Sequence, residues 1–427
     1  MFRRVKQLFA IVLFTVLGAV LISSLTNQAA AQSNQFGPTP TFAPYVSHPV
    51  GTYLLQRAIV ADFNNDGNQD VATPGYSPSI ATILWGDGAG NFPSQTQLPV
   101  GSFSVSLVAG DFNNDGKLDL AVPSFDENSL YTFLGDGAGG FSGAIISDAG
   151  TTPYAITKGD FNQDGKLDTA IIGESSETVS ILLGNGAGGF APPIQYNLSG
   201  EGPKGLNTAD FNGDHKLDIV VANRASTNVT VFYGDGNGQF SASQDIDVGG
   251  ITVDKDPTVA DFNNDGASDI GVEINYSEIV VLLGNGQGQF NQIHTPVNPV
   301  QINWVAAADV NNDNKPDFIM SEGGVGDEGR IAVHLGDGQG HFASSIDLPT
   351  LENPAGIAMG DFNNDTKPDI AITDYFFASV SVILNTTVSP PRYSDQCKKN
   401  GWTALIHPNG TPFKNQGDCI RYVNTGK

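Results

Sequence analysis

Short runs of apolar and β-branched residues alternate with clusters of Gly, Asn and Asp through most of this 427-residue chain. Examples are SVSLVAG (104–110), LDLAVPS (118–124), SLYTFLG (129–135) and FSGAIIS (141–147). Alternation within a run, β-branched content and the turn residues at each end predict strands rather than helices. Four such strands, A to D in chain order, recur in every unit of about 50 residues.

Two motifs separate the strands. The first, DFNNDGNQD at 62–70, recurs with small changes from residues 111, 160, 210, 261, 309 and 361, at spacings of 48 to 52 residues. The second, G-[DN]-G-x-G-x-F, has six copies, which end at Phe92, Phe141, Phe190, Phe240, Phe290 and Phe342. The acidic motif joins strand A to strand B, and the glycine motif is expected to join C to D as a hairpin.

Seven units of four antiparallel strands predict an all-β fold, a seven-bladed β-propeller, with a linear solenoid as the alternative. The ends of the array favour the ring. The seventh unit lacks the glycine turn and strand D after Leu384, whereas TFAPYVSHPVG (41–51) has the pattern of a lone strand D starting at Phe42. If that strand completes blade 7, the ring closes and no sheet edge remains open.

These interleaved motifs resemble FG-GAP or VCBS repeats, which occur in integrin α-subunit head domains and in many exported bacterial proteins. The resemblance covers about residues 41–388. It implies a seven-bladed propeller whose A to B loops hold calcium.

The acidic motif itself also predicts calcium, with up to seven ions. Asp or Asn stands at positions 1, 3, 5 and 9 of every copy, position 7 can offer its backbone carbonyl, and Ca²⁺ takes six to eight oxygen ligands. No His or Cys occupies a ligand position, which disfavours zinc and copper. The predicted ligands are Asp62, Asn64, Asp66, Asn68 and Asp70; Asp111, Asn113, Asp115, Lys117 and Asp119; Asp160, Asn162, Asp164, Lys166 and Asp168; Asp210, Asn212, Asp214, Lys216 and Asp218; Asp261, Asn263, Asp265, Ala267 and Asp269; Asp309, Asn311, Asp313, Lys315 and Asp317; and Asp361, Asn363, Asp365, Lys367 and Asp369.

Charge separates this reading from its alternative, seven polar Asx turns without metal. The chain has 20 basic and 45 acidic residues, and 21 of the acids are the loop aspartates. Three carboxylates within nine residues repel one another unless a cation compensates them. The same negative charge argues against nucleic acid or anionic lipid as a partner. Position 6 calls for a positive φ, which glycine adopts freely and Thr366 poorly, so loop 7 is expected to bind most weakly.

Strand alternation places the A to B and C to D turns on one face of the ring, called lower, and the B to C and D to A segments on the other, called upper. Exposed aromatic residues on an upper face are typical of glycan or protein recognition. The alternative is that they fill the channel or pack between blades. The candidates for this ligand face are Tyr53, Tyr76, Phe103, Phe125, Tyr154, Arg224, Tyr276, Trp304, Tyr375 and Phe376.

Catalysis has little support, because the six histidines form no metal motif and no G-x-S-x-G elbow occurs. We therefore expect an exported, monomeric calcium-binding module for adhesion to glycans or surface proteins. A polysaccharide lyase or hydrolase and a passive structural repeat protein are the alternatives.

The two ends carry different signals. Residues 1–31 have a basic start, an apolar run from Leu8 to Ile22 and an A-x-A cleavage site before Gln32, which predicts a removed signal peptide and a secreted, surface or periplasmic location, with no membrane span afterwards. The propeller is expected over 32–389. Residues 390–427 form a basic tail with both cysteines, Cys397 and Cys419, which are expected to pair in a small disulfide module. This tail resembles short cysteine modules of other exported bacterial proteins.

Overall fold

The computed structural model describes residues 36–425, apart from 253–255, 299–300, 324–327 and 388–411. Residues 40–387 form one compact unit, and the remainder belongs to a second unit. The predicted signal peptide lies outside the described residues.

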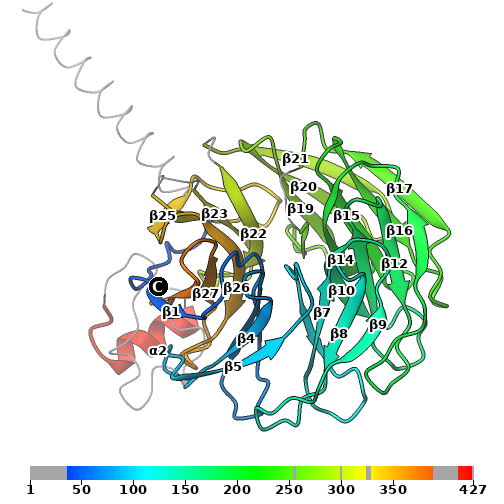
Figure 1. The fold of residues 1–427 in the computed structure, drawn as a ribbon. Coiled ribbons are helices and arrows are strands. Elements are labelled where there is room, and N and C mark those ends of the chain that lie inside the picture. Colours follow the sequence, from blue (N-terminus) through cyan, green and yellow to red (C-terminus); the bar gives the residue numbers. More distant parts are fainter. Residues whose placement is uncertain (1–35, 253–255, 299–300, 324–327, 388–411, 426–427) are drawn as a thin grey trace, which may run out of the picture. The chain divides into compact units, whose positions relative to one another are not determined.

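Seven antiparallel sheets of four strands each are arranged in a ring around a central channel (Figure 1), so the seven-bladed β-propeller is confirmed. Blade 1 contains β2 (Ile59–Ala61), β3 (Asp70–Gly75), β4 (Ile80–Trp85) and β5 (Ser94–Pro99); blade 2 contains β6 (Val108–Gly110), β7 (Asp119–Ser124), β8 (Ser129–Phe133) and β9 (Ile145–Asp148). Blade 3 contains β10 (Pro153–Gly159), β11 (Asp168–Gly173), β12 (Thr178–Leu182) and β13 (Ile194–Asn197); blade 4 contains β14 (Pro203–Ala209), β15 (Asp218–Asn223), β16 (Asn228–Tyr233) and β17 (Ala242–Asp247). Blade 5 contains β18 (Thr258–Ala260), β19 (Asp269–Ile274), β20 (Glu278–Gly284) and β21 (Phe290–Pro296); blade 6 contains β22 (Ile302–Ala308), β23 (Asp317–Glu322), β24 (Arg330–His334) and β25 (Ile346–Pro349). Blade 7 contains β26 (Pro354–Gly360), β27 (Asp369–Asp374), β28 (Ser379–Ile383) and, as its outermost strand, β1 (Val46–Pro49).

The N-terminal strand closes the ring, as the sequence predicts. β1 pairs antiparallel with β28, in a register that sets Val46 opposite Val382. The pairing extends past the strand ends, because the Ala43 N–H donates to the Leu384 carbonyl at 2.8 Å. Blade 7 therefore takes its outer strand from the start of the chain, and we call the join between blades 7 and 1 the seam.

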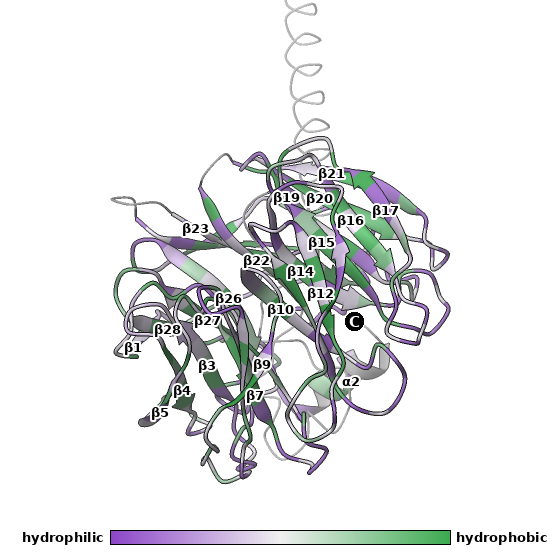
Figure 2. Cartoon of the chain, turned by 45° about the vertical axis from the view of Figure 1, so that its right-hand side comes forward, coloured by the Kyte–Doolittle hydropathy of each residue, from purple (hydrophilic) through white to green (hydrophobic). Residues whose placement is uncertain are grey.

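The apolar core lies between the blades. The second strand of each blade, for example β3 in blade 1 and β7 in blade 2, is buried along its whole length. The Phe at position 2 of the acidic motif packs edge-on against the hairpin Phe of the next blade, with ring centroids 5.6–6.1 Å apart at six of the seven blade interfaces. Figure 2 shows the apolar colouring concentrated in the strands and the hydrophilic colouring in the connecting loops. The position-2 side chains are therefore buried anchors between neighbouring blades.

The second unit contains one described helix, α2 (Gln416–Thr425), where no helix was predicted. Asn415 caps it, since its Oδ1 accepts the Asp418 N–H at 2.9 Å. The ring of Phe413 packs against that of Tyr422, and Cys419 is fully buried. Cys397 lies outside the described residues, so the disulfide stays a prediction. No helix in the described part of the chain is long and apolar enough to span a membrane.

Candidate functional site

Each acidic loop is folded by its own side chains. In loop 3, the Asp164 N–H donates to both Asp160 Oδ1 and Asn162 Oδ1 at 3.0 Å, and the Lys166 N–H donates to Asp164 Oδ1 at 3.0 Å. The Gly165 N–H donates to Asp160 Oδ2 at 2.9 Å. Two oxygens that accept the same N–H must lie close together, so the oxygens of positions 1 and 3 meet at one point of the turn, and the position-5 carboxylate begins the next hydrogen bond along the loop.

Two positions of every loop have a left-handed backbone. Position 6 has a φ of 62–88°, including His215, Asn314 and Thr366, which confirms the expectation from its glycines. Position 4 is also left-handed, with φ of 55–76°, which the sequence analysis missed. Its occupants are only Asn, Gln and Gly, and this restricted composition was the available signal.

The position-9 aspartates have a structural role that was not predicted. One carboxylate oxygen accepts the position-2 N–H at 2.8–3.0 Å in every loop. The other accepts a backbone N–H just after strand C of the same blade at 2.6–2.9 Å, from the first hairpin residue in blades 1 to 6 and from Asn385 in blade 7, which has no hairpin. Burial raises the pKa of these carboxyls, to about 6 for Asp168. Each aspartate thus ties its A to B loop to the end of strand C, and its role as a metal ligand stays a prediction.

The position-5 aspartate is the carboxylate whose second oxygen stays free of the backbone. In loops 2, 3, 4, 6 and 7, this Oδ2 faces the ammonium group of the position-7 lysine at 2.8–3.6 Å. In loops 1 and 5, where position 7 is Asn68 or Ala267, it instead accepts the amide N–H of the position-3 asparagine, at 3.1 and 2.9 Å. In every loop, Oδ2 of the position-5 aspartate is therefore engaged by a side chain of the same loop, either a lysine ammonium or an asparagine amide.

The donor set of the loops suits a hard cation. Positions 1, 3 and 5 offer only oxygen, which calcium prefers. Asp313 Oδ2 is buried and makes no hydrogen bond, with only the Lys315 ammonium at 3.6 Å. Across the described residues, no three His, Cys, Asp or Glu side chains are grouped as metal ligands. The position-9 carboxylate of each loop is engaged by two backbone N–H groups, as Asp70 is by those of Phe63 and Gly86. Asparagine oxygens and backbone carbonyls would have to complete the coordination.

Aromatic residues gather on the upper face at the seam. Tyr76 packs against Phe103 and Phe103 against Phe125, with centroids 4.8 and 5.1 Å apart, while Tyr375 packs against Phe376 at 4.9 Å. The backbone of the Tyr53 segment joins the two groups, since the Tyr53 N–H donates to Ser77 and the Leu54 N–H to Tyr375. Phe377, which was not predicted, is exposed like Tyr53, Tyr76 and Phe376, whereas Phe103, Phe125 and Tyr375 are half-buried. Phe103 and Phe125 also pack against the apolar core, so the alternative of packing between blades holds in part for these two. We call these residues the aromatic rim: Tyr53, Tyr76, Phe103, Phe125, Tyr375, Phe376 and Phe377.

The remaining predicted ligand-face residues lie elsewhere. Tyr154 and Trp304 are buried rather than exposed, and Trp304 lies in the channel. Arg224 and Tyr276 are exposed, on blades 4 and 5. The alternative of channel filling therefore holds for Trp304, and the rim is confined to blades 7, 1 and 2.

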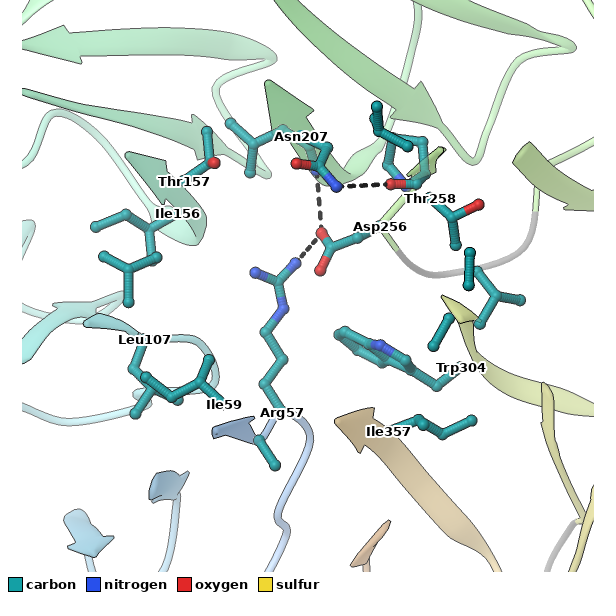
Figure 3. Close-up of a pocket in the computed structure, with 18 residues that line it drawn as sticks. Arg57, Ile59, Leu107, Ile156, Thr157, Asn207, Asp256, Thr258, Trp304 and Ile357 are labelled. Atoms are coloured by element: carbon teal, nitrogen blue, oxygen red, sulfur yellow. Dashed lines mark hydrogen bonds and ion pairs between the residues drawn. The ribbon is translucent and has the colours of Figure 1, made fainter. Parts of the chain in front are cut away.

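The channel contains a pocket of about 330 Å³ that the inner strands line (Figure 3). Arg57 reaches across it to form an ion pair with Asp256, and its second nitrogen donates to Ser106 Oγ at 2.6 Å. The guanidinium lies over the Trp304 ring, 5.1 Å from the centroid. Sequence reasoning missed this arrangement, although a charged residue two positions before an inner strand was a possible signal. The ion pair links blade 1 to the start of blade 5 across the ring.

A second, small cavity of about 10 Å³ adjoins Asp256 and Glu273. Glu273 is buried, and its carboxyl oxygens make no hydrogen bond of normal geometry with the described residues. Burial, with a smaller contribution from the Glu322 carboxylate, raises its pKa to about 8, while the nearby backbone N–H groups of Ser277 and Tyr276 offset part of the shift. Glu273 is therefore expected to be mostly protonated at neutral pH.

The comparisons agree with this architecture. An FG-GAP-like repeat matches residues 62–122, 121–171, 160–221, 210–272 and 323–372, which together cover more than half of the chain. The chain therefore belongs to the family of FG-GAP-like repeat proteins. A comparison with curated proteins gave no match.

Several solved structures share the fold. BBS1N, in its complex with ARL6DN, is 13% identical with a TM-score of 0.58, over 80% of this chain and 96% of its own. A streptogramin B lyase is 12% identical with a TM-score of 0.55, over 80% and 98%. An Agrocybe aegerita lectin that recognises non-reducing terminal N-acetylglucosamine is 17% identical with a TM-score of 0.53, over 81% and 95%. At these identities the likeness is one of fold alone.

Proposed function

We propose that this protein is an extracellular binding module that recognises glycans at the aromatic rim, on a propeller whose lower loops hold calcium. The observation that carries the proposal is the rim itself. It places seven aromatic residues, four of them exposed, on one side of the ring, on the face opposite the acidic loops. A propeller gives such a surface a rigid base, because the segments that carry it are anchored in adjacent blades.

The chemistry around the rim favours sugars. Aromatic faces stack on the apolar C–H face of a sugar ring, and nearby polar groups bind its hydroxyls. Next to Phe103 and Phe125, Ser102 Oγ donates to Asp126 Oδ2 at 2.7 Å, and the Ser102 N–H donates to Glu127. These carboxylates keep lone pairs for sugar hydroxyls. Together with the net charge of −25, they favour a neutral or amino sugar over an acidic one.

A glycan array with the purified whole chain tests this proposal. Tyr76→Ala and Phe376→Ala should each lower the affinity for a positive glycan by about fivefold or more, since loss of an aromatic anchor costs about 1–3 kcal/mol. Tyr276→Ala is the matched control: Tyr276 is 38% exposed and Tyr76 36%, but Tyr276 lies on blade 5 outside the rim. An equal loss in all three variants, or no binding at all, would contradict rim recognition.

Two other functions are outcomes of the same experiment. Binding to a surface protein but to no glycan, still sensitive to Tyr76→Ala, would assign the rim to protein adhesion. Release of reducing or unsaturated ends from polysaccharides would assign an enzyme. If the protein neither binds a glycan or surface protein nor cleaves a polysaccharide, a passive structural scaffold is favoured.

Calcium would be held by the side-chain oxygens of positions 1, 3 and 5 and the carbonyl of position 7. When bound, it would neutralise the carboxylates that converge in each loop. The loops stabilise the lower ends of the blades, so chelation should lower the melting temperature by several degrees. An unchanged melting temperature in EDTA, with no metal in the purified protein, would exclude calcium. Millimolar calcium outside cells is enough to fill even weak sites.

A further inference from the structure

The seven acidic loops differ at the oxygen that a cation would need. This oxygen is Oδ2 of the position-5 aspartate. Oδ1 of the same carboxylate accepts the N–H of position 7 at 2.8–3.1 Å in every loop, so only Oδ2 is left for a metal. Five loops fill this place with a lysine ammonium from position 7, and loops 1 and 5 contain no lysine.

We propose that these lysines are internal counter-ions that calcium must displace, so that loops 1 and 5 bind calcium first and the five lysine loops bind it later. The inference rests on the proposed calcium binding. In loops 2, 3, 4, 6 and 7 an incoming ion has to break an ion pair and then tolerate the ammonium group close to it. In loops 1 and 5 it has to break only one amide hydrogen bond, from Asn64 or Asn263.

The five lysine loops also differ among themselves. In loop 2, the side chains of Lys117 and Asp115 are 40% and 37% exposed, whereas those of Lys315 and Asp313 in loop 6 are 23% and 11% exposed. Solvent screens the exposed pair more than the sheltered one. Loop 6 is therefore expected to fill after loop 2, and high salt should reduce the difference between lysine loops and lysine-free loops.

Loop 1 has a particular place in the ring. Its position-7 residue, Asn68, accepts a hydrogen bond from Asn364 Nδ2 of loop 7 at 2.9 Å. The residue that stands in place of a lysine thus joins the two loops across the seam. Early calcium binding in loop 1 would therefore stabilise the lower side of the seam, where non-covalent pairing of β1 with β28 closes the ring.

Native mass spectrometry of the whole chain, titrated with calcium after treatment with chelator, counts the ions bound per molecule. Asp62→Ala combined with Asp261→Ala removes a ligand from loops 1 and 5, and should abolish the ions bound at the lowest calcium concentrations. Asp111→Ala combined with Asp160→Ala removes the same two charges from loops 2 and 3, and should leave those ions bound. An equal effect of the two double variants would overturn the proposal.

Exchange of the position-7 residues tests the lysine itself. Lys117→Asn should tighten one site by about two- to fivefold, the worth of an exposed ion pair, and so raise the mean number of bound ions at a given subsaturating calcium concentration. Asn68→Lys should lower that number. Lys204→Gln, which removes a positive charge outside the loops, is the control and should change nothing. If all three variants bind like the parent, or Lys204→Gln acts like Lys117→Asn, the lysines are not counter-ions of the sites.

The outcomes separate the two proposals. Calcium bound to seven equivalent loops would refute the order of filling and leave calcium binding intact. No bound calcium at any concentration would refute both.

Discussion

Substitution of a position-9 aspartate tests whether its hydrogen bonds to the backbone stabilise the loop independently of any bound metal. In loop 3, Asp168 accepts the buried N–H groups of Phe161 and Gly184 at 2.9 and 2.7 Å. Asp168→Ala leaves both without a partner. A buried, unsatisfied N–H costs about 1–3 kcal/mol, so the variant should lose about 2–6 kcal/mol of unfolding free energy.

The matched variant is Asn162→Ala in the same loop. Asn162 Oδ1 is a predicted ligand, but it accepts only the exposed N–H of Asp164, at 3.0 Å, which water can replace. In EDTA this variant should lose less than about 1 kcal/mol. In calcium it should lose more, because a ligand has been removed.

Urea unfolding of both variants, each in EDTA and in calcium, separates the two roles. Asp168→Ala should be strongly destabilised in both media, and Asn162→Ala mainly in calcium. If Asp168→Ala costs no more than Asn162→Ala in EDTA, the aspartate is not the structural link between loop and hairpin.

Three further changes have defined outcomes. Arg57→Ala leaves the largely buried Asp256 carboxylate without its ion pair and should cost about 3 kcal/mol in urea unfolding; simultaneous Asp256→Ala should restore part of this, and additive losses would contradict the pairing. Glu273 has a folded-state pKa raised to about 8 from 4.5, so the folded state holds its proton more tightly and stability should fall as pH rises from about 4.5 to 8. Glu273→Gln should flatten that slope in unfolding free energies measured at several pH values, and an unchanged slope would contradict the burial argument. Thr366 has a φ of 69°, so Thr366→Gly should raise the unfolding free energy by about 1 kcal/mol, and a loss would show that the hydroxyl matters more than the strain.

The sequence predicts the architecture well because the architecture is repetitive. One copy of the acidic motif fits several structures, but seven copies in register with six hairpins fit a closed ring. The missing hairpin after Leu384 and the lone strand near Phe42 are complementary, and the structure joins them through the Ala43 N–H. Position 6 was also predictable, since glycine in most copies indicates a positive φ.

The role of position 9 could not be predicted from its residue type. Aspartate suits both a metal ligand and an acceptor of backbone N–H groups, and only the spatial position of the segment after strand C, 15 to 19 residues further on, shows the second role. Trp304 was misplaced for a similar reason. Trp304 lies within β22, and its side chain is buried at the central channel. Tyr53 and Tyr76 lie outside the long strands, and their side chains are exposed. Arg57 and Asp256 are 199 residues apart and share no motif.

The aromatic rim and acidic loop 1 meet at the same place in the ring, the seam. The chain passes from the closing strand β1 through the Tyr53 segment into β2, so the rim lies on the upper side of the seam that the Asn68 to Asn364 hydrogen bond joins on the lower side. Loosening of loop 1 should therefore disturb the spacing between the Tyr76 and Phe376 groups, although no rim residue has changed. We expect Asp62→Ala to weaken glycan binding, and Asp160→Ala in loop 3, away from the seam, to leave it nearly unchanged. Equal glycan affinities of the two variants in calcium would show that the rim does not depend on closure of the ring.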